Sequence, residues 1–171
     1  MSIVARDMRA EDWPGVAEIY RQGLKTGVST LEGEVPTFEE WDAAHDKRCR
    51  LVVVSRTVTD KVIAWAALTP VSRRRVYSGV AEVSIYVDEE YRGQKMGQFL
   101  LNTLIEESEK EGFWMLQSSI LLDNLSSLIL HHRCGFREVG LRVHIGRNPQ
   151  GKWCSLVLLE RRSRTVGVGD S

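Results

Sequence analysis

The chain has 171 residues, 43% of them hydrophobic, and its 23 Lys and Arg balance 23 Asp and Glu. This length favours one domain with a single core, and a formal net charge of zero disfavours the broad basic field that binds nucleic acids. The three cysteines, Cys49, Cys134 and Cys154, include no Cys-x-x-Cys pair, so we expect neither a disulfide framework nor a bound metal. No apolar run approaches the ~18 residues that span a bilayer, and no signal peptide is recognisable. We therefore expect a cytoplasmic protein without a membrane or nucleic-acid partner.

The chain opens with a predicted strand and helix. Residues 3–8 alternate apolar and polar side chains, as a strand does. Asp12-Trp13-Pro14 then opens a helix, with proline in the first turn, where its missing N–H costs nothing. We expect this helix to end at Gly23 and Gly27.

A polar loop and a second helix follow. Residues 29–36 show no period and contain glycine and proline, which indicates a loop. Thr37-x-x-Glu40 is a capping box and predicts a helix that runs through Trp41 towards His45.

The next segments predict a hairpin and a cationic connection. Residues 51–54 and 62–68 have strand composition and are joined by a polar turn. Ser72-Arg73-Arg74-Arg75 is either a solvated loop or an anion-binding segment.

The centre of the chain predicts a strand, a basic loop and a helix. Residues 80–87 form a β-branched and aromatic run, and apolar residues from Met96 to Ile105 recur on one helical face, with Gly112 as a stop. Between them, Arg92 to Gly97 places small residues and successive N–H groups at a helix N-terminus. Such a loop suits an anion, most often a phosphate.

The last third predicts a strand over residues 114–120, a helix over 125–132 capped by Asn124, and two strands over 136–145 and 153–159. We expect one domain over residues 1–162 and a flexible tail over 163–171. The order of elements indicates an α/β fold with a mixed sheet, mostly antiparallel, flanked by helices.

Two motifs resemble the GNAT superfamily of N-acetyltransferases. Arg92 and Gly97 match the ends of its pyrophosphate loop, Arg/Gln-x-x-Gly-x-Gly/Ala. The segment from Asn124 to Phe136 is similar to its second pattern, Asn-x-x-Ala/Ser-x-x-x-Tyr-x-x-x-Gly-Phe, with Ser127 and Gly135 also matching. His131 stands at the tyrosine position, as in the phosphinothricin acetyltransferase branch. Further branch-like features are Ser29-Thr30, Ala81-Glu82 and Gly151-x-Trp153.

This resemblance implies a sheet splayed at a site for acetyl-CoA, and a homodimer. The pantetheine arm would pair with the backbone of Ile85, Tyr86 and Val87. The resemblance also gives further cofactor-binding residues: Arg92, Gly93, Gln94, Lys95, Met96, Gly97, Asn124 and Ser127.

The resemblance also implies catalytic and acceptor-binding residues. Glu82 is the candidate base that deprotonates the amine, directly or through water, although a solvated glutamate at a strand end is the structural alternative. His131 either donates a proton to the leaving thiolate or hydrogen-bonds near it. The expected acceptor is a small amine, an amino acid or amino-acid analogue of the phosphinothricin or methionine-sulfoximine type. Its candidate binding residues are Ser29, Thr30, Glu32, Arg74 and Tyr77.

Three positions depart from the pattern. Lys95 replaces the first glycine of the loop, and we expect it to take ordinary right-handed dihedrals with its side chain pointing outward. Ser155 stands where the branch tends to have an acidic residue, and Val83 where some members have histidine. Two other functions stay open: acetylation of a protein or peptide, and a non-catalytic module that binds acyl-CoA.

Overall fold

The computed structural model describes residues 2–57 and 59–169, in which seven strands form one sheet. The strands are β1 (Ile3–Asp7), β2 (Leu51–Ser55), β3 (Lys61–Pro70), β4 (Val80–Val87), β5 (Met115–Leu121), β6 (Arg137–Arg147) and β7 (Trp153–Arg162). The helices are α1 (Trp13–Thr26), α2 (Phe38–Ala44), α3 (Met96–Lys110) and α4 (Leu125–Arg133), with 3₁₀ turns η1 (Ala10–Asp12), η2 (Arg75–Tyr77) and η3 (Glu89–Tyr91). Met1 and the last two residues of the predicted tail lie outside the described residues.

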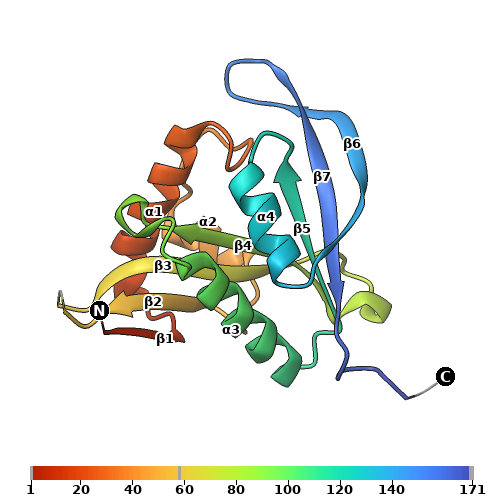
Figure 1. Cartoon of the computed structure of the whole chain (residues 1–171), viewed down its shortest axis with the longest axis horizontal. Helices are drawn as coiled ribbons and strands as arrows, with labels where there is room; N and C mark the ends of the chain where they lie inside the picture. The colour runs from red at the N-terminus through yellow and green to blue at the C-terminus, as the bar shows by residue number, and fades with distance from the viewer. Residues whose placement is uncertain (1, 58, 170–171) are drawn as a thin grey trace.

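The sheet runs in the order β1-β2-β3-β4-β5-β7-β6. Every neighbouring pair is antiparallel except β4 and β5, which are parallel. Helices α3 and α4 cover one face of the sheet, and α1 and α2 cover the other (Figure 1). The predicted fold class, a mixed and mostly antiparallel sheet flanked by helices, is confirmed.

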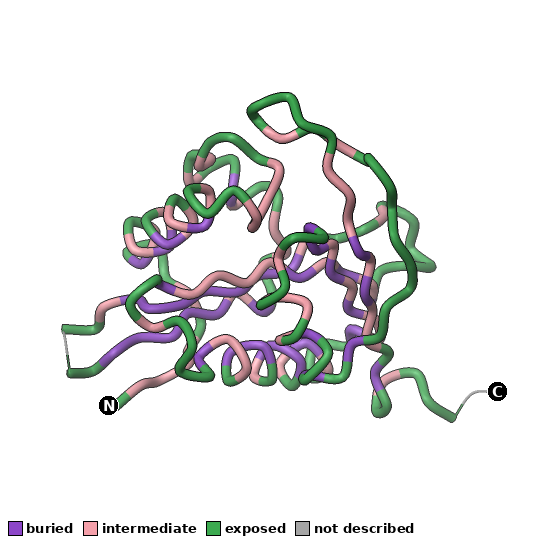
Figure 2. Tube along the Cα trace, turned by 45° about the horizontal axis from the view of Figure 1, so that its top comes forward, coloured by how far each residue is buried: buried purple, intermediate pink, exposed green. Residues whose placement is uncertain are grey.

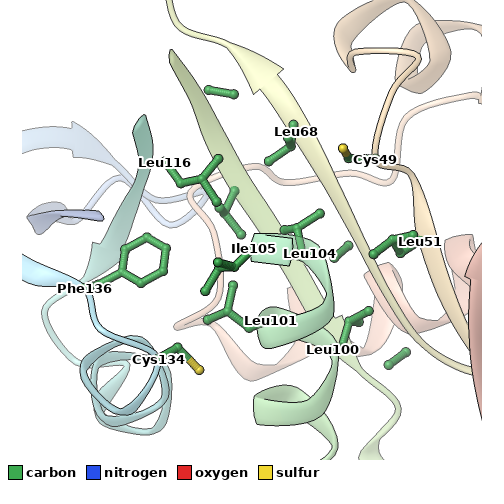
Figure 3. Close-up of a cluster of buried hydrophobic side chains, with 14 of the residues drawn as sticks. Cys49, Leu51, Leu68, Leu100, Leu101, Leu104, Ile105, Leu116, Cys134 and Phe136 are labelled. Carbon is green, nitrogen blue, oxygen red and sulfur yellow. The ribbon is translucent and has the colours of Figure 1, made fainter. Parts of the chain in front are cut away.

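A separate core packs on each face of the sheet. Leu100, Leu101 and Leu104 of α3 are fully buried against the strands, and Figure 3 shows them facing Leu51, Leu68 and Leu116. Each buried leucine of this kind contributes about 1.5–3 kcal/mol of burial free energy. On the other face α1 and α2 bury Val16, Ile19 and Trp41 against Trp65 of β3.

Local signals explain most helix boundaries. The Thr37 hydroxyl accepts from the backbone N–H of Glu40, and the Glu40 carboxylate accepts from that of Thr37, so the predicted capping box is confirmed. Helix α1 ends at Gly27, whose φ of 70° is left-handed. The prediction that Gly23 also ends α1 is wrong. Gly23 is buried within the helix, where a Cβ would lie 2.6 Å from Cε1 of Tyr86.

The C-terminal strand is longer than the sequence indicated. The strand predicted over residues 153–159 continues to Arg162, and Arg161 and Arg162 pair with β5. Ser163 is buried, and its hydroxyl accepts from the backbone N–H groups of Thr165 and Val166. Within residues 2–57 and 59–169, no helix is both long and apolar enough to cross a membrane.

Candidate active site

The central feature of the site is the gap between β4 and β5. The two strands pair only where Val80–Glu82 meets Met115–Gln117, and Gly79 closes this end by accepting from the N–H groups of Trp114 and Met115. Beyond Glu82, β4 stays paired with β3, while β5 stays paired with β7. One edge of β4 from Val83 to Val87 therefore faces the gap without a neighbouring strand, and the gap opens into a cavity of about 690 Å³. The predicted splay is confirmed.

The side chains of β4 alternate between the two faces of the sheet. Val83, Ile85 and Val87 pack with α3, whereas Tyr86 packs with α1, and Glu82 and Ser84 share its parity. Ile85, Tyr86 and Val87, the predicted partners of the pantetheine arm, all line the cavity. The Tyr86 ring itself is held in a stack with Trp65, at a centroid distance of 5.0 Å, and its contribution at the splay edge is its backbone.

The loop between β4 and α3 lines one end of the cavity. Arg92, Gly93, Lys95, Met96 and Gly97 all line it, as predicted, and their backbone leads into the N-terminus of α3. Gln94 does not line it; its side chain donates instead to the carbonyl oxygen of Glu90 at 3.0 Å.

Lys95 overturns one expectation. Its φ of 61° and ψ of 14° are left-handed, not right-handed, and it is the N-cap residue of α3. A side chain in this region costs roughly 1–2 kcal/mol, which is why glycine suits the position. Gly97 is needed for a different reason: a Cβ there would lie 3.1 Å from Cδ2 of Leu130, so the glycine lets α3 and α4 approach closely.

Helix α4 contributes the second motif. The Asn124 side chain accepts from the backbone N–H of Ser127 at 3.2 Å, which confirms Asn124 as the N-cap residue. Both residues line the cavity, and so do Leu130, His131 and Arg133 further along the helix. Arg133 was missed because a single arginine near a helix end is an ordinary feature of a sequence.

His131 is 1% exposed and is fixed in one tautomer. Its Nδ1 lies 2.8 Å from the carbonyl oxygen of Ser127, and since a carbonyl can only accept, Nδ1 carries the proton. Nε2 is then an acceptor, buried and without a hydrogen-bond partner among the described residues. Burial lowers the pKa of His131, opposed by the hydrogen bond to Ser127 and assisted by His132. The ring also meets Phe136 edge-on, at a centroid distance of 5.0 Å.

Glu82 lies on the opposite side of the splay. It is half-buried, and its Oε1 accepts a hydrogen bond of 2.7 Å from the hydroxyl of Ser119 in β5. Ser119 also lines the cavity and orients the carboxylate. Sequence reasoning missed Ser119, although a polar residue in a strand bordering the site is a usable signal. Glu82 thus faces the α1 side of the sheet, whereas His131 lies on the α3 side. Because the gap connects the two sides, both residues line the same cavity.

The connection between α1 and α2 forms another part of the cavity lining. Ser29, Thr30 and Glu32, the predicted acceptor-binding residues, all line it, together with Leu31. Burial raises the pKa of both Tyr20 and Tyr86, with Glu32 adding to the effect and a hydrogen bond to Thr30 opposing it. The tyrosines therefore stay protonated at neutral pH, and their hydroxyls lie beside this loop.

Arg74 and Tyr77, the other predicted acceptor-binding residues, do not line this cavity. Both are exposed at η2, where the Arg74 guanidinium lies 5.5 Å from the centre of the Tyr77 ring. The cavity's basic side chains, among the described residues, are Arg92, Lys95 and Arg133. No group of three or more His, Cys, Asp or Glu suited to a metal occurs within the described part of the chain.

Two relatives of assigned activity are similar to this chain along most of its length. The phosphinothricin N-acetyltransferase of Alcaligenes faecalis is 31% identical over 174 residues, covering 97% of this chain and 84% of the relative. The L-methionine sulfoximine/L-methionine sulfone acetyltransferase of Pseudomonas aeruginosa is 27% identical over 164 residues, covering 94% of each.

A solved structure and a family model agree with these relatives. A GNAT superfamily phosphinothricin acetyltransferase from Sinorhizobium meliloti, crystallised in complex with AcCoA, superposes with a TM-score of 0.87 at 27% identity, covering 99% of this chain and 93% of that one. The model of the Acetyltransferase (GNAT) family matches residues 13–136. The resemblance carried by the two motifs is therefore confirmed, and the chain belongs to the GNAT family of acetyltransferases.

Proposed function

We propose that this acetyltransferase moves the acetyl group of acetyl-CoA to the amino group of a small amino acid or amino-acid analogue of the phosphinothricin or methionine-sulfoximine type. The observation that carries the proposal is a cavity that is lined both by the N-terminus of α3, which suits a phosphate, and by the Glu82 carboxylate, which Ser119 orients. The names of the similar proteins support the donor and the acceptor class.

The donor is proposed to lie along the splay. Backbone N–H and C=O groups on the free edge of β4, from Val83 to Val87, suit the two amides of the pantetheine arm. The pyrophosphate would meet the N–H groups at the start of α3, beside Arg92 and Lys95. Asn124 and Ser127 of α4 would contact the cofactor from the other side, and Arg133 would add a third positive charge near its phosphates.

Glu82 is proposed as the general base. It takes a proton from the acceptor ammonium, directly or through one water, and the freed amine attacks the thioester carbonyl. A C–N bond forms and the C–S bond breaks; the nitrogen loses its second proton as the amide forms, and this loss balances the proton that the leaving CoA thiolate takes up. The Ser119 hydroxyl keeps one carboxylate oxygen aimed at the gap.

His131 is proposed to act as a hydrogen-bond acceptor near the sulfur. Of its two predicted roles, donation to the thiolate requires a proton on Nε2, whereas the Ser127 carbonyl holds the ring proton on Nδ1. The lowered pKa of His131 also favours the neutral ring. The lone pair of Nε2 then suits the S–H group of the CoA product.

The acceptor is proposed to sit between Glu82 and the loop of Ser29, Thr30 and Glu32. Among the described residues, the basic side chains that line the cavity are Arg92, Lys95 and Arg133, and all three are assigned here to the cofactor. Within one chain Arg74 and Tyr77 stand outside the cavity, so their proposed contact with an anionic acceptor requires a second copy of the chain.

A homodimer is proposed for the same reason. Strand β6 ends the sheet, so one edge of its backbone is without a neighbouring strand, and the strand is exposed along most of its length (Figure 2). Its exposed residues include the apolar Val139, Leu141, Val143 and Ile145. Such an edge is a template for pairing. Sedimentation at micromolar concentration tests this proposal, and a monomer would contradict it.

Thiol release from acetyl-CoA tests the reaction itself. We expect release with methionine sulfoximine or phosphinothricin and little with N-terminal peptides. Release with peptides alone would favour the peptide enzyme, and acyl-CoA binding without release would favour a non-catalytic module. A cytoplasmic location is also proposed, supported by the three free cysteines, and cell fractionation tests it.

A further inference from the structure

The wall of the acceptor site includes a contact between two segments far apart in the chain. Leu31, in the connection between α1 and α2, lines the cavity, and its Cδ1 points at Gly146 near the end of β6. A Cβ on Gly146 would lie only 2.7 Å from that atom. The φ of Gly146 is not left-handed, so the backbone itself accepts any residue there. The absence of a side chain at position 146 is therefore what allows Leu31 its place.

The same loop approaches the hairpin at a second position, Gly33. Gly33 lies close to the β6–β7 turn, because a Cβ added to it would lie 3.4 Å from Cγ of Pro149. Figure 1 shows this hairpin extending past the end of β5, with the α1–α2 connection beneath it. The hairpin thus forms the outer boundary of the loop that carries Leu31.

Side-chain hydrogen bonds hold the hairpin on either side of this contact. The register of β6 shifts between Arg142 and Gly146, and the N–H of His144, with φ of 49°, donates to the Ser155 hydroxyl at 3.0 Å. In the turn, the Asn148 side chain accepts from the N–H groups of Gln150 and Lys152. The Leu31 side chain, in contrast, ends in freely rotating methyl groups. When the contact tightens, Leu31 moves.

We infer that positions 31 and 146 together set the size of acceptor that the enzyme takes. The inference rests on the proposed function and adds to it a limit on the acceptor side chain. Without a side chain at position 146, Leu31 keeps its place beside the hairpin, and on this inference an acceptor of methionine-like length fits the cavity next to it. A methyl group at position 146 displaces Leu31 towards the cavity that it lines, and shortens the acceptor that fits.

The test compares Gly146→Ala, Leu31→Ala and the double variant with the wild type. The acceptors are neutral amino acids of rising length, from alanine through norvaline to methionine, each measured as kcat/KM at saturating acetyl-CoA. Gly146→Ala should lower the methionine-to-alanine ratio by about tenfold, the value of roughly one methylene group in an apolar pocket. Leu31→Ala should raise that ratio, and the double variant should recover the ratio of Leu31→Ala, because the methyl group no longer has Leu31 to push.

The control is Gly140→Ala, the same substitution in the same strand with nothing within 4 Å of the new Cβ. It should leave the ratio and the thermal midpoint unchanged. The KM for acetyl-CoA should stay unchanged in every variant. Unchanged ratios in Gly146→Ala and Leu31→Ala, or strictly additive effects in the double variant, would overturn the inference.

Failure of the proposed function is a separate result. If the wild type acetylates no amino acid, the acceptor class is wrong. The same four proteins are then compared with primary n-alkylamines of rising length, on which the size limit must appear as the same shift of the ratio. If that shift is absent, positions 31 and 146 do not limit the size of the acceptor, whichever amine is the natural acceptor.

Discussion

The two ends of the cavity are built in different ways. The end proposed for acetyl-CoA is made of consecutive backbone, from Arg92 into the first turn of α3, with Gly97 packed against Leu130. The end proposed for the acceptor is made of side chains from three separate segments, Glu82 in β4, Ser119 in β5 and the loop at Leu31, and Gly146 of the β6–β7 hairpin lies next to Leu31. Substitutions should therefore act on catalysis and acceptor choice at one end, and on backbone strain at the other.

The largest effect is expected for Glu82→Gln, which removes the proposed base and keeps its size. We expect kcat to fall by ~10²-fold or more, with the KM for acetyl-CoA little changed, because the group acts in the transition state. Steady-state kinetics measure this, with Glu138→Gln as a control carboxylate on the exposed strand β6. Unchanged turnover from pH 6 to 9 would show that Glu82 is only a strand-end carboxylate.

His131→Phe should have the next largest effect. Transfer should slow by ~10-fold to 100-fold, because the acceptor atom proposed to face the sulfur is lost. The neighbouring His132→Phe is the matched control, since His132 is exposed and pairs with Glu138. A large fall of the thermal midpoint, with normal turnover per folded molecule, would assign His131 to the core alone.

Acid should destabilise the protein through two histidines. Burial lowers the pKa of His131 and of His45 below the 6.5 of an ordinary histidine. Between that value and the folded pKa, the unfolded chain binds more protons, so the free energy of unfolding rises with pH. This contribution is complete above about pH 6.5 and is lost as the pH falls through the folded pKa. Thermal midpoints from pH 7.5 to 5 should fall more steeply in wild type than in His131→Phe, and equal slopes would contradict the assignment.

The smallest effect is expected at the cofactor end, for Lys95→Gly. Relief of the left-handed backbone should stabilise the protein by about 1 kcal/mol and leave acetyl-CoA affinity within about tenfold. Gly93→Ala is the converse variant, because Gly93 has φ of 74° and open space around a new Cβ. It should destabilise by a similar amount. Denaturant midpoints measure both, and a gain in acetyl-CoA affinity above a hundredfold in Lys95→Gly would mean that the lysine obstructs the loop.

The same contrast explains what the sequence could predict. The elements and the mixed sheet follow from hydrophobic period and capping residues, and they are confirmed from β1 to β7. The left-handed Lys95 was missed because lysine rarely adopts that backbone. Ser119, Leu31 and Gly146 come together only after the sheet has brought distant segments side by side, so no local spacing marks them. Arg74 was proposed because it belongs to the cationic run at residues 73–75, and in one chain it lies, with Tyr77, outside the cavity.

The splay of β4 from β5 has a consequence for amide hydrogen exchange. In an antiparallel pair, alternate residues direct their N–H groups at the partner strand, and the others direct theirs at the opposite side. From Val83 to Val87, β3 therefore protects one set of amides, while the other set faces the gap. Protection along this one strand should alternate residue by residue in the free protein, and a bound pantetheine chain should even it out. The pattern of amide protection along β4 thus reports whether the gap is filled.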